Sequence, residues 1–152
     1  MSVDFNRATG LLILEVVNSN PNGDPDREND PRQRPNGLGE ISPVSVKRKI
    51  RDLIEDHDGV FFQSLPEAYI RQADLYCILE SRGRDRAAIT KEMNDNPNFM
   101  DSTFVRKYWD ARIFGNTFLE DGGNKEYIKT GAVQFGMGTH GGAALGFAKR
   151  IQ

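Results

Sequence analysis

Apolar positions first gather in a short run near the start of the chain, Leu11–Val17, which reads LLILEVV. Branched apolar residues in a run of this length are typical of a buried strand, although periodicity alone does not separate such a strand from a buried helical turn. The pattern therefore predicts a first strand within the core of the fold.

A long polar loop follows this run. Residues 18–40 hold four prolines and three glycines and almost no apolar side chains, a composition that excludes a helix or a central strand. Structureless connections of this length are uncommon inside a compact domain, so we expect the loop to be functional or mobile.

The clearest helical pattern begins at Ser42. Serine is a favoured N-cap, and Pro43 suits the first helical position. Gly59 stands where a helix would end on a glycine, so the pattern predicts a helix from Ser42 to about Asp58. Its inward face would carry apolar residues at helical spacing and one histidine: Val46, Ile50, Leu53, Ile54 and His57.

Weaker patterns cover the rest of the chain. They predict a strand at Leu75–Leu79, a helix at Arg86–Asn94, a helix at Phe104–Phe114 that ends at Gly115, and a strand near Ala132–Phe135. No internal repeat is present, and a length of 152 residues suits a single domain.

Composition narrows the class of protein. The net charge of −2 excludes a uniformly basic protein, but nucleic-acid binding needs only a local basic surface. The single cysteine, Cys77, excludes a disulfide framework and a cysteine-rich zinc site. No apolar run is long enough to span a membrane and the start of the chain lacks a signal-peptide pattern, so the sequence predicts a soluble, cytoplasmic protein.

Positive charge gathers in one region of this mildly acidic chain. From Arg27 to Arg51, seven basic residues stand against three acidic ones, a local net charge of +4. Lys47 and Arg51 repel each other at i, i+4 spacing, and cations early in a helix oppose its dipole. Phosphate neutralisation would offset both penalties, whereas the alternative interpretation is a solvated helix face beside a solvated loop.

Two other groups of residues suggest chemistry. Asp24, Asp26 and Asp30 of the polar loop could hold Mg²⁺, or they could simply form turns; the calcium-loop pattern fails because Asn29 and Pro35 occupy the glycine and glutamate positions. A second group combines aromatic side chains, which suit either base stacking or the core, with two flanking cations: Tyr108, Trp109, Phe114, Phe135, Lys107 and Arg112.

Four blocks in the same order carry a resemblance to a known family. They are Leu14–Val16 leading to Asn20–Asp26 (NPNGDPD), then Val46–Arg51 (VKRKIR), Trp109–Gly115 (WDARIFG) and Gly131–Phe135 (GAVQF). The sequence resembles the backbone subunit of type I CRISPR Cascade complexes, most closely the Csd/Csh-type proteins of the RAMP superfamily, with alanine in the last block where the family has proline.

This resemblance implies an α+β fold with an RRM-like (ferredoxin-like) palm. We expect one domain over residues 1–152, with palm elements at 8–17, 42–58 and 104–136, a long loop at 18–41 and a finger-like insertion at 59–103. The family's chains are longer, so we expect a truncated chain with an incomplete palm. An unpaired sheet edge would make it poorly soluble or oligomeric unless a partner covers it.

The resemblance also implies a function. It suggests a non-catalytic subunit, without metal or cofactor, that grips the phosphate backbone of a guide RNA and polymerises along it. Its partners would be copies of itself head to tail, other Cascade subunits and the target DNA strand, with no membrane. The expected RNA-binding residues are Ser42, Ser45, Lys47, Arg48, Lys49, Arg51, Arg27, Arg32, Arg34, Lys107, Arg112 and Gln134.

Two alternatives remain open at this point. Backbone subunits of the related type III complexes place an aspartate in the corresponding loop, so Asp24, Asp26 or Asp30 could serve a metal-dependent endoribonuclease. The short length also allows a degenerate fragment that has only a protein-interaction role.

Overall fold

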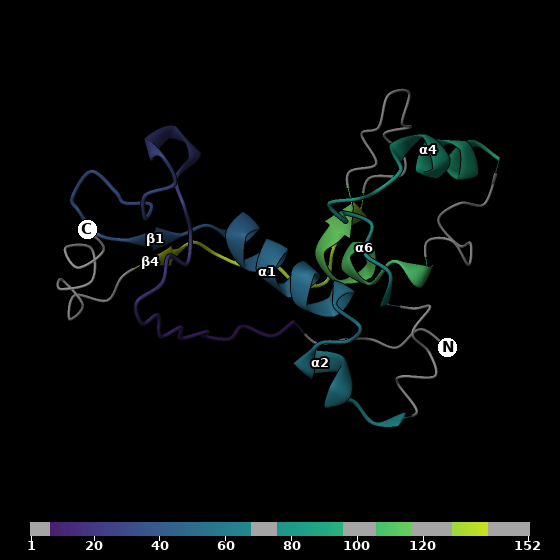
Figure 1. Cartoon of the computed structure of the whole chain (residues 1–152), viewed down its shortest axis with the longest axis horizontal. Coiled ribbons are helices and arrows are strands. Elements are labelled where there is room, and N and C mark those ends of the chain that lie inside the picture. The colour runs from purple at the N-terminus through teal and green to yellow at the C-terminus, as the bar shows by residue number, and fades with distance from the viewer. Residues whose placement is uncertain (1–6, 68–75, 96–105, 117–128, 140–152) are drawn as a thin grey trace. The chain divides into compact units, whose positions relative to one another are not determined.

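The computed structural model describes residues 7–67, 76–95, 106–116 and 129–139, and Figure 1 traces its path. The chain divides into two compact units, which are described separately: residues 1–40 with 139–152, and residues 41–138. Helices and small two-stranded sheets occur together, which is compatible with the predicted α+β class. No helix in the described ranges is both long and apolar enough to cross a lipid bilayer.

The strand predicted at Leu11–Val17 is wrong for the structure described here. The run is extended, but it belongs to no strand and pairs with none of the described strands. Its side chains face solvent, with Leu11 88% and Ile13 81% exposed. A buried strand needs a hydrogen-bonded neighbour and a covering layer, and the described residues supply neither to this run.

The polar loop of residues 18–40 is built from turns. A short 3-10 helix, η1 (Pro25–Arg27), starts at Asp24, whose carboxylate accepts a hydrogen bond from the Asp26 N–H at 3.2 Å. The Asp24 N–H donates to the Asp30 carbonyl at 2.8 Å, which closes the turn. Asx turns of this kind explain how a chain rich in Asn, Asp and Pro keeps a defined path without regular structure.

The helix predicted after Ser42 is confirmed by α1 (Pro43–Glu55). The Ser42 Oγ accepts a hydrogen bond from the Ser45 N–H at 3.1 Å, which satisfies one of the N–H groups left unpaired at a helix start. The helix ends earlier than predicted, with Asp56 as its C-cap. Gly59 is the N-cap of the next helix and does not end α1.

Within residues 41–138, α1 meets α2 (Val60–Gln63; Figure 1), and the core forms there. Ile54, Phe62 and Ile78 are buried at its centre, and burial of such side chains is the main favourable term in folding. Two predictions for the inward face are wrong: Leu53 is 48% exposed, and His57 lies beyond the end of α1, exposed to solvent. α1 ends before His57, whose ring contacts that of Phe62 with the centroids 4.3 Å apart. Partly buried neighbours of the core are Ile50, Phe61, Leu65, Tyr76 and Trp109.

The described residues after α2 include two helices, α4 and α6. The prediction for Arg86–Asn94 is confirmed by α4, which spans those residues. The helix predicted at Phe104–Phe114 is present as α6 (Trp109–Phe114), with residues 104–105 outside the described ranges. Tyr108 interrupts the predicted helix because it forms a parallel β-bridge with Cys77. That bridge is also the one described pairing within the strand predicted at Leu75–Leu79.

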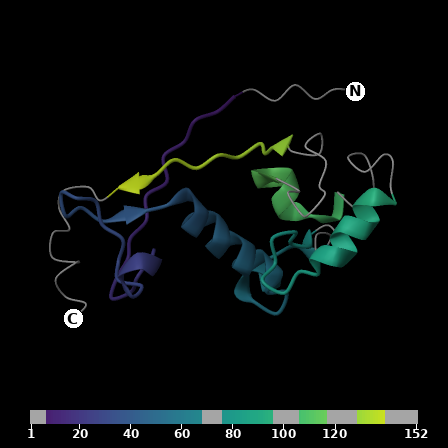
Figure 2. The ribbon, with the colours of Figure 1, turned by 90° about the horizontal axis from the view of Figure 1, so that it is seen from above.

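The strands are short. β2 (Gly115–Asn116) pairs antiparallel with β3 (Lys129–Thr130), and β1 (Glu40–Ile41) pairs with β4 (Gly138–Thr139). The strand predicted near Ala132–Phe135 is wrong: the segment between β3 and β4 is extended (Figure 2) but pairs with no strand in the described part of the chain. Its backbone is held by α6, since the Val133 N–H donates to the Ile113 carbonyl at 2.9 Å.

Gly131 explains how this segment comes so close to α6. A Cβ atom at Gly131 would overlap the carbonyl carbon of Phe114 and the nitrogen of Gly115. Only glycine fits such an approach of two backbones. The approach leads into a ring contact between Phe114 and Phe135, whose centroids are 6.0 Å apart.

Candidate nucleic-acid interface

The cations predicted to bind RNA from α1 fall into two groups. Its two arginines are engaged with other parts of the same unit, whereas its two lysines have no carboxylate partner among the residues that are described. Sequence reasoning treated the four as one cluster. The contacts of each side chain show what it contributes.

Arg51 forms an internal ion pair. Its Nε lies 2.8 Å from Oδ2 of Asp110, and the two side chains are only 13% and 1% exposed. The same carboxylate accepts hydrogen bonds from the Leu79 N–H at 2.7 Å and the Glu80 N–H at 3.1 Å. Asp110 therefore ties α1, α6 and the 79–80 turn together, and the charge of Arg51 is compensated inside the protein.

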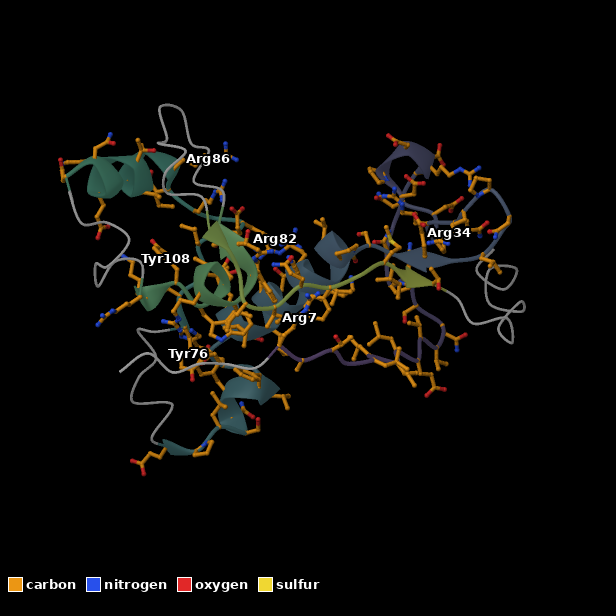
Figure 3. The ribbon with its side chains drawn as sticks, turned by 180° about the vertical axis from the view of Figure 1, so that it is seen from behind. Arg7, Arg34, Tyr76, Arg82, Arg86 and Tyr108 are labelled. Carbon is orange, nitrogen blue, oxygen red and sulfur yellow. The ribbon has the colours of Figure 1, made fainter. Side chains whose placement is uncertain are left out.

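Arg48 serves the same turn. Its Nη1 donates to the Glu80 carbonyl at 2.6 Å, and its Nε lies 3.0 Å from Oδ1 of Asp52 as an ion pair without hydrogen-bond geometry. Asp52 also pairs with Arg82 at 3.0 Å, on the side seen in Figure 3. Desolvation acts to raise the pKa of Asp52, but the two arginines outweigh it and hold this pKa below its ordinary value.

Lys47 and Lys49 are differently placed. The Lys47 Nζ lies 5.4 Å from the centroid of the Phe114 ring, a cation–π contact that orients the ammonium without neutralising it. Lys49 is exposed, and its Nζ donates to the Ser45 Oγ at 3.5 Å. These two ammonium groups are the positive charge that α1 offers to an external anion.

The remaining candidates of this unit are less distinctive. The Lys107 Nζ lies 3.8 Å from Oε2 of Glu92 and 5.1 Å from the centroid of the Tyr108 ring. Burial, with Glu92 nearby, raises the pKa of Tyr108 to about 12. Arg112 is exposed on α6, and desolvation lowers its pKa below the ordinary value. Gln134 is exposed, with its Nε2 donating to the Gly131 carbonyl at 3.1 Å.

The loop arginines belong to the other unit. Arg32 and Arg34 place their Nε atoms 2.7 Å and 3.2 Å from the two carboxylate oxygens of Glu40. Hydrogen bonds from Arg32 first, and then from Arg34, hold the pKa of Glu40 below its ordinary value. Arg27 is exposed at the end of η1.

The three loop aspartates follow turn chemistry more closely than metal chemistry. The Asp24 carboxylate is engaged by the Asp26 N–H, and Asp30 contributes its backbone carbonyl to the same turn. Within the described ranges, no group of three or more His, Cys, Asp or Glu side chains is arranged to hold a metal ion.

Asp110 is the important residue that sequence reasoning missed. It was noted only as part of the WDARIFG block, although it is the most buried side chain described. A carboxylate between Trp109 and Ala111 in the first turn of a helical segment was the available signal, because a buried charge needs a partner. Nothing in the sequence pointed to Arg51, 59 residues away, as that partner.

Comparison with known proteins agrees with the resemblance drawn from the sequence. The model of the family described as "CRISPR-associated protein Cas7" matches residues 6–148. A curated relative, the CRISPR-associated protein Cas7 of Haloferax volcanii, is 28% identical over 132 residues, which cover 80% of this chain.

The match covers 35% of that relative, so the chain spans about a third of its length. The family match, in contrast, includes all the sequence blocks identified above, together with α1, Asp110 and the loop arginines. On this evidence, the chain belongs to the family of CRISPR-associated protein Cas7.

Proposed function

We propose that this chain is a guide-RNA-binding backbone subunit of a type I CRISPR surveillance complex, and that it holds RNA without cutting it. The proposal rests on a difference in contacts between the arginines and the lysines of α1. Arg48 and Arg51 are engaged within the protein, while Lys47 and Lys49 have no carboxylate partner in the described part of the chain.

The proposed contact is electrostatic. Lys47 and Lys49 neutralise phosphates of the RNA and release the counterions condensed there, which makes binding dependent on salt but not on base sequence. Sequence specificity is left to base pairing between the guide and its target. The Arg51–Asp110 pair contributes indirectly, because it holds α1 in place under the two lysines.

The assembly follows from the family. In this proposal the chain supplies part of an RRM-like palm, and copies pack head to tail along the guide. A head-to-tail contact does not close on itself and so extends into a filament. Other Cascade subunits and the target DNA strand complete the complex in the cytoplasm.

The absence of catalysis is part of the proposal. The Asp24 carboxylate accepts the Asp26 N–H, so it is already used to shape its turn. We expect a matched RNA to remain intact when it is incubated with the chain and Mg²⁺. Cleavage that is abolished by Asp24→Asn or Asp30→Asn would show the endoribonuclease instead.

The binding claim is tested with Lys47→Ala/Lys49→Ala. We expect weaker binding to a single-stranded RNA, and a plot of log affinity against log salt that is less steep by about 1.4, because each phosphate contact on a single strand contributes about 0.7. Lys91→Ala, which removes an exposed lysine from α4, is the matched control and should leave the slope unchanged. An unaltered slope in the double variant would refute the assignment.

A further inference from the structure

The hairpin that carries Arg32 and Arg34 is closed by backbone hydrogen bonds. Its backbone pairs Gln33 with Gly39, and the Glu40 N–H donates to the Arg32 carbonyl at 3.0 Å. At its tip the Gly37 N–H donates to the Arg34 carbonyl at 2.9 Å. Gly37 has a φ of 79°, which matches a tight turn followed by a left-handed residue.

This backbone brings both arginines onto one carboxylate. Arg32 and Arg34 are two residues apart on an extended segment, so their side chains leave from the same face. Each guanidinium donates through Nε to a different oxygen of Glu40. The carboxylate is covered, at 13% exposure, whereas the arginine side chains are 44% and 41% exposed.

The arrangement leaves most of each guanidinium unused. An arginine has five N–H donors, and here each arginine spends its Nε–H on Glu40. Among the residues the structure describes, the Nη groups of Arg32 and Arg34 have no partner. One carboxylate also cannot balance two cations, so the trio keeps a charge of +1 on two exposed donor forks.

A single arginine paired with Glu40 would be enough to stabilise the hairpin. A single arginine can bind a carboxylate with two parallel N–H groups, which is the stronger geometry. Here two arginines share the carboxylate, whose single charge offsets their mutual repulsion only in part, and an anion on the exposed side would offset the rest. Phosphate oxygens suit paired guanidinium forks better than they suit ammonium groups.

We propose that Arg32 and Arg34, held in position by Glu40, bind one phosphate group between them. This inference rests on the proposed function where it names the ligand as a backbone phosphate of RNA. Glu40 is a positioning residue: it orders both side chains before the anion arrives, which lowers the entropic cost of binding.

The first test is whether one phosphate is shared. RNA affinity and its salt slope are measured for Arg32→Ala, Arg34→Ala and the double variant, with Arg82→Ala as a control, since Arg82 is likewise an exposed arginine paired with one carboxylate. We expect each single loss to weaken binding about tenfold, the double variant to lose little more, and the slope to fall by about 0.7. Additive losses with a fall of about 1.4 would mean separate contacts and would overturn the shared site.

The second test separates this site from the function as a whole. Arg32→Lys and Arg34→Lys keep the charge but lose the fork, so the salt slope should persist while affinity falls. Inorganic phosphate is then titrated against the unaltered chain, with the arginine side-chain NMR signals as readout. Phosphate shifts at both arginines in a chain that fails to bind RNA would support the anion site and reject the RNA function. Full RNA affinity in Arg32→Ala/Arg34→Ala, with a loss in Lys47→Ala/Lys49→Ala, would reject the site and keep the function.

Discussion

Replacing Asp110 tests whether the internal ion pair organises the unit that carries α1. Its two carboxylate oxygens accept from three donors: Oδ2 from the Arg51 Nε and the Glu80 N–H, and Oδ1 from the Leu79 N–H. The side chain is 1% exposed, so water does not replace a lost partner. Each donor that loses its acceptor is therefore left unsatisfied.

The structure sets the expected magnitude. Asparagine keeps one oxygen, which can retain Arg51 and Glu80, but its amide nitrogen then faces the Leu79 N–H. One unsatisfied buried donor costs about 1 to 3 kcal/mol, and removing the charge leaves Arg51, at 13% exposure, uncompensated. Breaking a buried ion pair typically costs about 3 to 5 kcal/mol, so we expect Asp110→Asn to lower the free energy of unfolding by about 3 kcal/mol.

Urea unfolding of the full chain measures this change. The matched control is Asp58→Asn, an exposed aspartate beyond the end of α1, which should alter stability by less than about 0.5 kcal/mol. Arg51→Met combined with Asp110→Asn should recover part of the loss, because no buried cation is then left without a partner. If Asp110→Asn is as mild as the control, the ion pair does not hold this unit together.

Three further predictions concern other parts of the chain. Gly131→Ala should lower the free energy of unfolding by about 1 to 3 kcal/mol, because its Cβ would overlap the backbone at Phe114; a urea transition at the unaltered midpoint would contradict the close approach. Ser42→Ala should cost about 1 kcal/mol through the lost cap of α1, whereas Ser42→Gly should cost only a few tenths; equal losses in urea unfolding would argue against the cap. The carboxylate of Glu40 should titrate by NMR below its ordinary pKa, and in Arg32→Ala/Arg34→Ala this pKa should return upward. Because the folded pKa is the lower one, the stabilisation that it reports is present above the ordinary pKa and is lost as the pH falls through the folded value.

Local signals in the sequence were sufficient for the start of α1 and for α4, whereas α2 was not predicted and α6 begins later than predicted. Ser42-Pro43 marks the start of α1, and the bounds of α4 are those predicted, Arg86–Asn94. These features act within a few residues, so a single sequence contains them. The blocks WDARIFG and GAVQF also marked segments that the structure places in contact, through Phe114 and Phe135.

The predictions that were wrong concern features that depend on residues far apart in the chain. The apolar run Leu11–Val17 has strand character, but burial needs a neighbouring strand, and none of the described strands pairs with it. The α1 cluster was predicted as one patch because its charges are adjacent in sequence. The arginines differ from the lysines because Arg51 contacts Asp110 and Arg48 contacts the carbonyl of Glu80. Only the folded chain brings these groups together.

The central claim is that RNA lies against the lysines of α1. Acetylation of lysines, mapped by mass spectrometry with and without bound single-stranded RNA, tests this contact directly. We predict that Lys47 and Lys49 become protected when RNA binds, while Lys91 on α4 reacts to the same extent in both states. RNA that binds fully while Lys47 and Lys49 stay as reactive as in the free protein would contradict the account.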